Sequence, residues 1–322
     1  SHRVISTLRC PVVEPAVDTT AQIVAKSLAS LGADGVYNEP LRKGLLRYVS
    51  VRSNYRGETL ITLVAARSDD PRLRPLATKL MERCPELVGV TLNVNPTKGN
   101  RLFGDQRIPL AGRKTLQEGF GDIRVLLGGE SFAQAHRHVA SELYKFVIQT
   151  AMQGESSPPR CWDLFCGTGA LSFGLFAKGC SVLGVELDPT SVALAQEQKH
   201  RIVGSDGEVS TGIRFLSTDA NACSPEASSL LPEPDAGILN PPRGGCEESL
   251  LDELIQLEIR RLIYISCNPK TLARDLSRLT SGGYHLTRLR GFDMMPHTPH
   301  LESVAVLERK QSPEKPDRIL SK

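Results

Sequence analysis

The sequence predicts an α/β protein in two parts, an N-terminal α+β domain followed by a doubly wound parallel sheet. The chain has 322 residues, more than a typical single domain. From Arg160 onward, short apolar runs alternate with turns and helical stretches, a pattern typical of a parallel sheet with crossover helices. Glycines and polar residues follow these runs, at the edge where open α/β sheets bind ligands.

The domain boundary is predicted between residues 133 and 134. The first domain covers 1–133, and the second covers 134–310, opening with a linking helix and linker over 134–159. The polar tail 311–322 is predicted to be disordered. The elements predicted for the first domain are a helix over 19–32 capped by Thr19 or Thr20, strands over 45–52 and 58–66, a helix from Asp70-Pro71 to about Arg83, and a strand over 87–95.

Charge is divided unevenly along the chain. Residues 1–150 carry 21 Lys and Arg against 14 Asp and Glu, whereas 151–322 carry 18 against 22, giving the net +3. Several of the basic residues in the first half lie near aromatic ones, as Arg47 and Arg56 lie beside Tyr48 and Tyr55. This composition suits RNA phosphates and stacked bases, so we expect an RNA-binding first domain. The alternative is that this uneven distribution of charge is only the ordinary variation found among solvated protein surfaces.

Composition also limits the cellular setting. There is no apolar run near the ~18–20 residues that a membrane span needs, and the first residues show no signal-peptide pattern. Eight cysteines occur without a CxxC pair, which argues against both a disulfide framework and a zinc site. We therefore expect a cytoplasmic protein without membrane association and without an obligate protein partner.

Five parallel strands are predicted in the second domain, and polar or glycine-rich residues follow each of them. The strands end near Asp163, at Glu186, near Asp219, at Asn240 and at Cys267. Because the carboxyl ends of parallel strands meet at one edge of a sheet, these residues should surround a common site.

The turn after the first of these strands predicts a nucleotide-like cofactor. Gly167-x-Gly169 is an incomplete GxGxxG pattern, since Ser172 holds the third position. Such a turn lets the backbone approach a ligand and points helix amides at an anion such as a carboxylate. Glu186, at the next strand end, can accept hydrogen bonds from both ribose hydroxyls. We expect S-adenosylmethionine. An NAD site is disfavoured, because Asn240-Pro241-Pro242-Arg243 suits a methyltransferase and no hydride partner is evident.

Cys267 lies in Ser266-Cys267-Asn268-Pro269, directly after an apolar strand. A thiolate at that edge can add to an electron-poor ring carbon, which suggests covalent methyl transfer to C5 of a pyrimidine. A buried strand-end cysteine is the alternative, because free cysteines are among the most buried residues.

With Gln134 ahead of DLFCGTG, GVELD, NPPR, SCNP and PHTPHLE in that order, residues 1–310 closely resemble the RNA uracil-5 methyltransferases. Many members read Asp-Pro-Pro-Arg where this chain has Asn-Pro-Pro-Arg. That difference, with no room ahead for a TRAM domain, looks most like the bacterial RlmC type, which acts on 23S rRNA. The tRNA T-loop type is the close relative.

The resemblance implies a Rossmann-like, S-adenosylmethionine-dependent catalytic domain. Its implied cofactor contacts fall on Gln134, Phe165, Glu186 and Asn240, around the Gly167 turn; its nucleophile falls on Cys267 and its proton acceptor on Glu302. His297 and His300 stay open as other bases, although a Pro-His-Thr-Pro-His turn more often orders a loop. The expected substrate is an RNA loop uridine flipped into the pocket, in 23S rRNA or alternatively in the tRNA T-loop.

Members of the RlmC type often hold an iron–sulfur cluster with three N-terminal cysteines and a fourth in a Cys-Pro pair. Cys10-Pro11 looks like that fourth position, but the nine residues before it contain no cysteine. Because a cluster needs about four thiolates, we expect neither a cluster nor another metal in this chain. Either the sequence lacks an N-terminal segment or this member has lost the cluster.

Two other classes of protein remain open. A noncatalytic RNA-binding homologue would keep the sheet but lose Cys267 or Glu302, and both are present. A DNA cytosine-5 methyltransferase uses the same covalent chemistry, but its cysteine usually follows a proline, whereas Cys267 follows Ser266.

Overall fold

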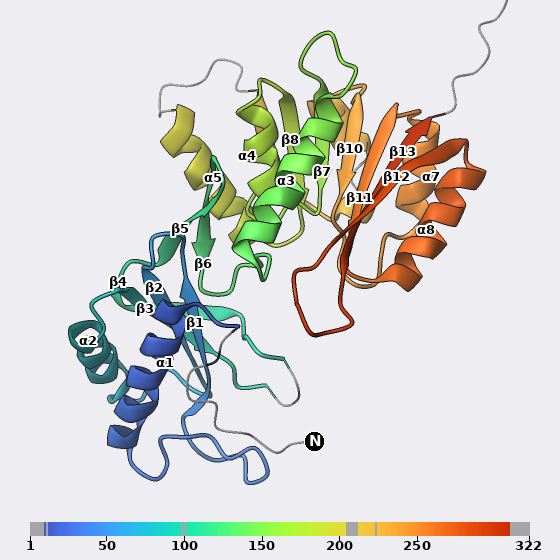
Figure 1. Ribbon diagram of the computed structural model, residues 1–322. Coiled ribbons are helices and arrows are strands. Elements are labelled where there is room, and N and C mark those ends of the chain that lie inside the picture. Colours follow the sequence, from blue (N-terminus) through green and yellow to red (C-terminus); the bar gives the residue numbers. More distant parts are fainter. Residues whose placement is uncertain are drawn as a thin grey trace, which may run out of the picture. The chain divides into compact units, whose positions relative to one another are not determined.

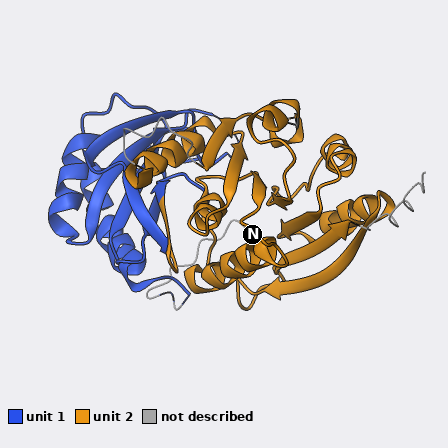
Figure 2. Ribbon diagram, turned by 90° about the horizontal axis from the view of Figure 1, so that it is seen from above, with its two compact units in different colours: residues 1–119, 126–132 blue, residues 120–125, 133–322 orange. Residues whose placement is uncertain are grey.

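The computed structural model describes residues 10, 12–97, 99, 101–203, 212–222 and 224–309 (Figure 1). The tail 311–322, predicted to be disordered, lies outside the described residues. The chain divides into two compact units: unit 1 comprises residues 1–119 and 126–132, and unit 2 comprises residues 120–125 and 133–322 (Figure 2). A two-stranded sheet of β5 (Thr115–Phe120) and β6 (Ile123–Gly128) contributes residues to both units.

Unit 1 is built on a four-stranded sheet in the order β1-β2-β3-β4. The strands are β1 (Leu46–Ser53), β2 (Thr59–Ala65), β3 (Leu87–Val94) and β4 (Gln106–Gly112). β2 and β3 are parallel, and the other two pairs are antiparallel. The two helices are α1 (Pro15–Leu28), extended by a 3₁₀ turn over Ala29–Leu31, and α2 (Leu73–Arg83). α1 contacts β1 and β2, and α2 contacts β3 and β4, so the helices and the sheet enclose one apolar core.

Both helices of unit 1 begin at residues other than those predicted. α1 begins at Pro15, whose fixed φ suits a first turn, and Thr20 is buried within the helix, where its hydroxyl lies 3.2 Å from that of Thr59. α2 begins at Leu73, because the Asp70 carboxylate accepts a hydrogen bond from the Arg72 amide (3.1 Å) and forms a turn ahead of the helix.

Unit 2 contains a seven-stranded sheet in the order β12-β13-β11-β10-β7-β8-β9. The strands are β7 (Arg160–Leu164), β8 (Ser181–Glu186), β9 (Ile213–Ser217), β10 (Ala236–Leu239), β11 (Arg261–Ser266), β12 (Tyr284–Phe292) and β13 (Glu302–Arg309). The five predicted parallel strands are confirmed, and β13 pairs antiparallel with β11 and with β12. The structure therefore confirms a doubly wound α/β sheet.

Helices and 3₁₀ turns connect these strands. They are α3 (Arg137–Met152), α4 (Ala170–Phe176), α5 (Pro189–Val203), a 3₁₀ turn over Ala220–Ala222, α6 (Ser224–Leu230), α7 (Glu248–Gln256) and α8 (Pro269–Ser281). α3 begins at Arg137 with His136 as N-cap, so Gln134 precedes the linking helix in which it was expected. Within the part of the chain that the structure describes, no helix is both long and apolar enough to cross a bilayer.

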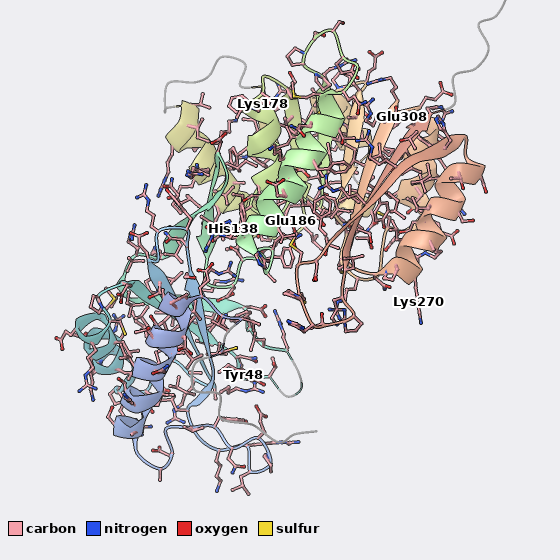
Figure 3. The ribbon with its side chains drawn as sticks, viewed as in Figure 1. Tyr48, His138, Lys178, Glu186, Lys270 and Glu308 are labelled. Carbon is pink, nitrogen blue, oxygen red and sulfur yellow. The ribbon has the colours of Figure 1, made fainter. Side chains whose placement is uncertain are left out.

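The parallel strands of unit 2 end at one edge of the sheet. In Figure 3, Glu186 at the end of β8 and Lys270 at the start of α8 lie at the same end of unit 2, and Lys178 and Glu308 lie at the opposite end. The core beneath this edge includes Trp162, whose indole donates to the Leu231 carbonyl (2.9 Å). A rigid sheet thus holds the loops that carry the predicted site residues.

Candidate active site

The turn between β7 and α4 depends on left-handed backbone. Phe165 and Gly167 have φ of 62° and 57°, and Gly169 has a φ of 85° at the N-cap of α4. A Cβ on Gly169 would lie 2.8 Å from the Phe215 ring, so this glycine is needed for packing. A Cβ on Gly167 would meet no atom within 4 Å, so this glycine borders open space. The open space beside the first glycine fits the close approach of a cofactor.

Glu186 is fixed by two backbone amides. Its Oε2 accepts a hydrogen bond from the Gly167 amide (2.9 Å), and its Oε1 accepts one from the Asp188 amide (2.8 Å). Each carboxylate oxygen keeps a further lone pair, which could accept a ribose hydroxyl. The Glu186 carboxylate therefore joins the turn after β7 to the end of β8.

Asp163 lies beneath this turn and is buried. Its Oδ2 accepts a hydrogen bond from the Ser172 hydroxyl (2.5 Å), and its Oδ1 has no partner among the described residues. Burial raises the pKa of Asp163 to about 7, with a further increase from the nearby Glu186 charge. Ser172, which replaces the third glycine of the sequence pattern, therefore ties the first turn of α4 to the end of β7.

Asn240 begins the loop after β10, and its backbone amide donates to the Leu164 carbonyl (3.2 Å), next to the turn after β7. The Arg243 carbonyl in the same loop accepts from the Asn268 amide side chain (3.0 Å) and the Thr271 hydroxyl (3.2 Å). The loop after β10 is thus held against the N-terminus of α8.

Asp275 strengthens this connection from within α8. Its carboxylate is buried and accepts hydrogen bonds from the Tyr264 hydroxyl (2.5 Å) and the Cys246 amide (2.9 Å). A Cβ on Gly245 would lie 2.5 Å from Asp275 Oδ2, so only glycine allows this approach. Asp275 therefore fixes the loops after β10 and β11 together, although nothing in the sequence pattern indicated it.

Cys267 lies between the end of β11 and the N-cap of α8. The Ser266 hydroxyl accepts from the Asn268 amide (3.1 Å), and the Asn268 side chain caps the helix by accepting from the Lys270 amide (3.1 Å). Among the described cysteines of unit 2, only Cys166 and Cys267 are partly rather than fully buried. Burial raises the pKa of the Cys166 thiol well above its usual range, so Cys267 is the better placed nucleophile.

Glu302 is the first residue of β13 rather than part of the preceding turn. β11 and β13 pair antiparallel through Ser266 and Ser303; Cys267 directly follows this pair at the end of β11, and Glu302 directly precedes it at the start of β13. The side chain of Glu302 has no hydrogen-bond or ion-pair partner within the described chain, and the residue is 9% exposed. Burial raises the pKa of Glu302 to about 6. The segments that carry Cys267 and Glu302 therefore meet at the carboxyl edge of the sheet.

Gln134 lies in the extended segment between β6 and α3. The Arg261 guanidinium, at the start of β11, donates to the carbonyls of Thr150 (2.7 Å) and Gln153 (2.8 Å) and so holds the end of α3 at the amino edge of the sheet. The 16-residue helix is about 24 Å long, so its beginning lies toward the carboxyl edge. This arrangement brings Gln134 toward the end of the sheet that carries Glu186 and Cys267.

The structure also describes Cys10, which is partly buried, whereas Pro11 lies outside the described residues. Among the described residues, no group of three or more His, Cys, Asp or Glu side chains is arranged to hold a metal ion. The residues at the carboxyl edge fit an organic cofactor, because they offer backbone amides, an acidic acceptor and open space beside a glycine.

The fold and the site define a Rossmann-like methyltransferase. A solved structure titled as Pyrococcus abyssi tRNA (uracil-54, C5)-methyltransferase with S-adenosyl-L-homocysteine is similar to this chain with a TM-score of 0.75 and 24% identity, covering 95% of this chain and 70% of that one. A family model described as tRNA (Uracil-5-)-methyltransferase matches residues 235–310, which include Cys267 and Glu302.

Curated relatives give the family. The 23S rRNA (uracil(747)-C(5))-methyltransferase RlmC of Shewanella sp. strain W3-18-1 is 33% identical over 275 residues, 84% of this chain and 67% of that protein. The Shewanella oneidensis RlmC is 36% identical over 270 residues, which are 82% of this chain and 66% of that protein. An uncharacterized RNA methyltransferase of Synechocystis is 32% identical over 310 residues, which are 96% of this chain and 64% of that protein. The chain thus spans about two thirds of the length of these relatives, and it belongs to the RNA uracil-5 methyltransferase family.

Proposed function

We propose that this chain is an S-adenosylmethionine-dependent methyltransferase that modifies uracil C5 in RNA, with a loop uridine of 23S rRNA as the substrate. The observation that supports the proposal is the β11–β13 register, which brings the segments carrying Cys267 and Glu302 together at the edge that also carries Gly167 and Glu186. The RlmC relatives support an rRNA substrate. The description of the family model names tRNA, so tRNA is the alternative substrate.

Uracil C5 is a poor nucleophile, and Cys267 addresses this problem. Its thiolate forms a bond from Sγ to C6, which moves electron density onto C5 and O4. The Gly167 turn, Glu186 and Asn240, together with Phe165 and Gln134, would hold S-adenosylmethionine, which would supply an electrophilic methyl group. The electron pair on C5 would form the new bond to that methyl group as its bond to the sulfonium sulfur breaks, leaving S-adenosylhomocysteine. Cys267 stays bonded to C6 during this transfer and holds the ring in place.

Glu302 then accepts the proton from C5, and the electron pair of the C5–H bond expels Sγ from C6 as a thiolate. Only the ionised carboxylate can accept this proton. Because burial raises the pKa of Glu302 to about 6, the rate of this step should rise as the pH increases through about 6. The absence of a partner for Glu302 among the described residues leaves its oxygens available to the substrate.

Replacing Glu302 with Gln tests the proposal, because the amide cannot take the C5 proton while Sγ is still bonded to C6. We expect a methyl-labelled protein–RNA adduct that survives denaturing electrophoresis. It should be absent from the Cys267→Ala, Glu302→Gln double variant and present in the matched Cys166→Ala, Glu302→Gln variant. Separate hairpins from the uridine-747 loop of 23S rRNA, from a tRNA T-loop and from DNA identify the substrate.

Normal turnover by Glu302→Gln, or an adduct without methyl label, would remove Glu302 from the proton-acceptor role and make His297 or a water molecule the next candidate. A wild-type protein that binds the RNA hairpins but methylates none of them would instead support the noncatalytic homologue.

A further inference from the structure

β12 is the outermost strand of the unit 2 sheet (Figure 1). Every residue between Tyr284 and Phe292 is exposed. The pairing with β13 shifts between Leu286 and Arg288, so Thr287 is an extra residue in the strand. A bulge of this kind changes the direction of the side chains that follow it. Arg288 and Arg290 are two residues apart and therefore share a face, and the bulge places that face on the side of Val306 and Val304 rather than of Leu307.

That face also carries the proposed proton acceptor. Arg288 pairs with Val306, Arg290 with Val304, and Phe292 with Glu302. Directly opposed residues of an antiparallel pair share a face, so Arg290 and Glu302 lie on the same side of the sheet, two positions apart along β13. Two positions correspond to about 7 Å along a strand, so the two side chains can contact one nucleotide and its neighbour.

Aromatic rings hold both guanidinium groups. The guanidinium carbon of Arg290 lies 5.1 Å from the ring centroid of Phe146, in α3, and 4.8 Å from that of Phe292. The guanidinium carbon of Arg288 lies 5.6 Å from the same Phe146 ring. Within the described chain, neither arginine side chain has an ion-pair or hydrogen-bond partner. Two positive charges thus share one ring, and their repulsion would be relieved by a bound anion.

Resting on the function proposed above, we propose that Arg288 and Arg290 bind phosphates of the RNA strand next to the target uridine. Stacking leaves the edge of each planar guanidinium, with its hydrogen-bond donors, free to contact phosphate oxygens. The exposed strand edge lets a polyanion approach, and the position of Glu302 on the same face relates the phosphates to the reacting base. Arg288 and Arg290 are therefore positioning residues for the RNA.

The double variant Arg288→Gln, Arg290→Gln tests this inference, with Arg201→Gln as the control. Arg201 is an exposed arginine of α5 that pairs with Glu197 (2.6 Å). Fluorescence anisotropy of a uridine-747 hairpin RNA, measured from 50 to 300 mM KCl, gives the affinity and its salt dependence. We expect about tenfold weaker binding and a loss of roughly 1.5 from the slope of log affinity against log salt, because two phosphate contacts are removed.

The control and the affinity for S-adenosylhomocysteine should stay within about twofold of the wild-type values. Arg290→Lys, which keeps the charge but loses the planar edge, should retain most of the salt slope while raising the KM for RNA and leaving kcat unchanged.

An unchanged salt slope in the double variant would overturn the inference. In that case, a lowered melting temperature would show that the arginines only stabilise the aromatic packing, and self-association would show that they only protect the strand edge. Failure of the proposed function gives a different result: the wild-type protein would show the arginine-dependent salt slope and yet transfer no methyl group to any of the RNAs.

Discussion

At the scale of single residues, the two carboxylates at the carboxyl edge have different surroundings. Glu186 is fixed by the amides of Gly167 and Asp188, whereas Glu302 is buried without a partner in the described part of the chain. A carboxylate held by donors suits a permanent acceptor for ribose hydroxyls. A buried carboxylate that lacks donors holds its proton more readily, which suits an acceptor of the C5 proton.

The buried Glu302 should reduce the stability of the fold at high pH. Its pKa is about 6 in the folded protein and about 4.5 in the unfolded chain, so the folded state binds the proton more tightly. The stabilisation is complete below about pH 4.5 and is lost as the pH rises through 6. The change in unfolding free energy caused by Glu302→Gln should therefore be more stabilising at pH 8 than at pH 4.5. The difference between the two pH values should be up to ~2 kcal/mol.

Urea unfolding of the wild type and the variant at both pH values measures this difference. Glu142→Gln is the control, because it removes the charge of an exposed glutamate of α3 and leaves every buried charge in place. An equal effect of Glu302→Gln at the two pH values would show that burial does not shift the titration of Glu302.

At the scale of elements, the turn after β7 separates packing from binding within three residues. Gly169 faces the Phe215 ring and Gly167 faces open space, although both have a positive φ. The same turn joins β7 to α4 through the Asp163–Ser172 hydrogen bond. One glycine therefore serves the fold, and the other borders the space that fits the cofactor.

This division predicts different effects for two matched variants. Gly169→Ala places a Cβ 2.8 Å from the Phe215 ring and should cost about 1–3 kcal/mol of unfolding free energy. Gly167→Ala should cost about 1–2 kcal/mol for its left-handed backbone, without a steric clash, but should weaken S-adenosylhomocysteine binding at least tenfold. Urea unfolding and calorimetric titration measure the two effects. If Gly167→Ala bound the ligand as tightly as the wild type, this turn would not be the cofactor site.

At the scale of the whole molecule, Arg261 connects distant parts of unit 2. Its guanidinium donates to carbonyls at the end of α3 and to the Glu308 carboxylate in β13 (2.6 Å), and it is 5% exposed. Helix and sheet edge are thus held together by one buried cation. The start of α3, next to Gln134, takes its position from this contact.

Arg261→Met should therefore cost about 3–5 kcal/mol of unfolding free energy, because it leaves buried carbonyls and Glu308 without their donor. Arg260→Met is the matched control, since the neighbouring Arg260 is exposed and pairs with Glu155 at the surface, where ion pairs contribute about 1 kcal/mol or less. Urea unfolding at pH 7 compares the two. Equal losses would show that Arg261 is not what holds α3 to the sheet.

The sequence by itself determined the doubly wound sheet of unit 2 and the family. The apolar runs that end at Glu186, Asn240 and Cys267 are short and bounded by turn residues, and such local signals do not depend on distant contacts. The motifs indicated the family for the same reason, because their residues are contiguous. The division into domains at residue 133 and the roles assigned to the site residues remain predictions.

Only the tertiary structure decided which distant residues meet. The register of β11 against β13 brings the segments of Cys267 and Glu302 together, and a bulge in β12 turns Arg288 and Arg290 toward the face of Glu302. Thr20, expected as an N-cap, is likewise buried within α1, where its hydroxyl lies 3.2 Å from that of Thr59. Register, bulges and burial arise from pairing between segments far apart in the chain, so no local pattern specifies them. The residue types of the proposed site were readable in the sequence, whereas their arrangement came from the fold.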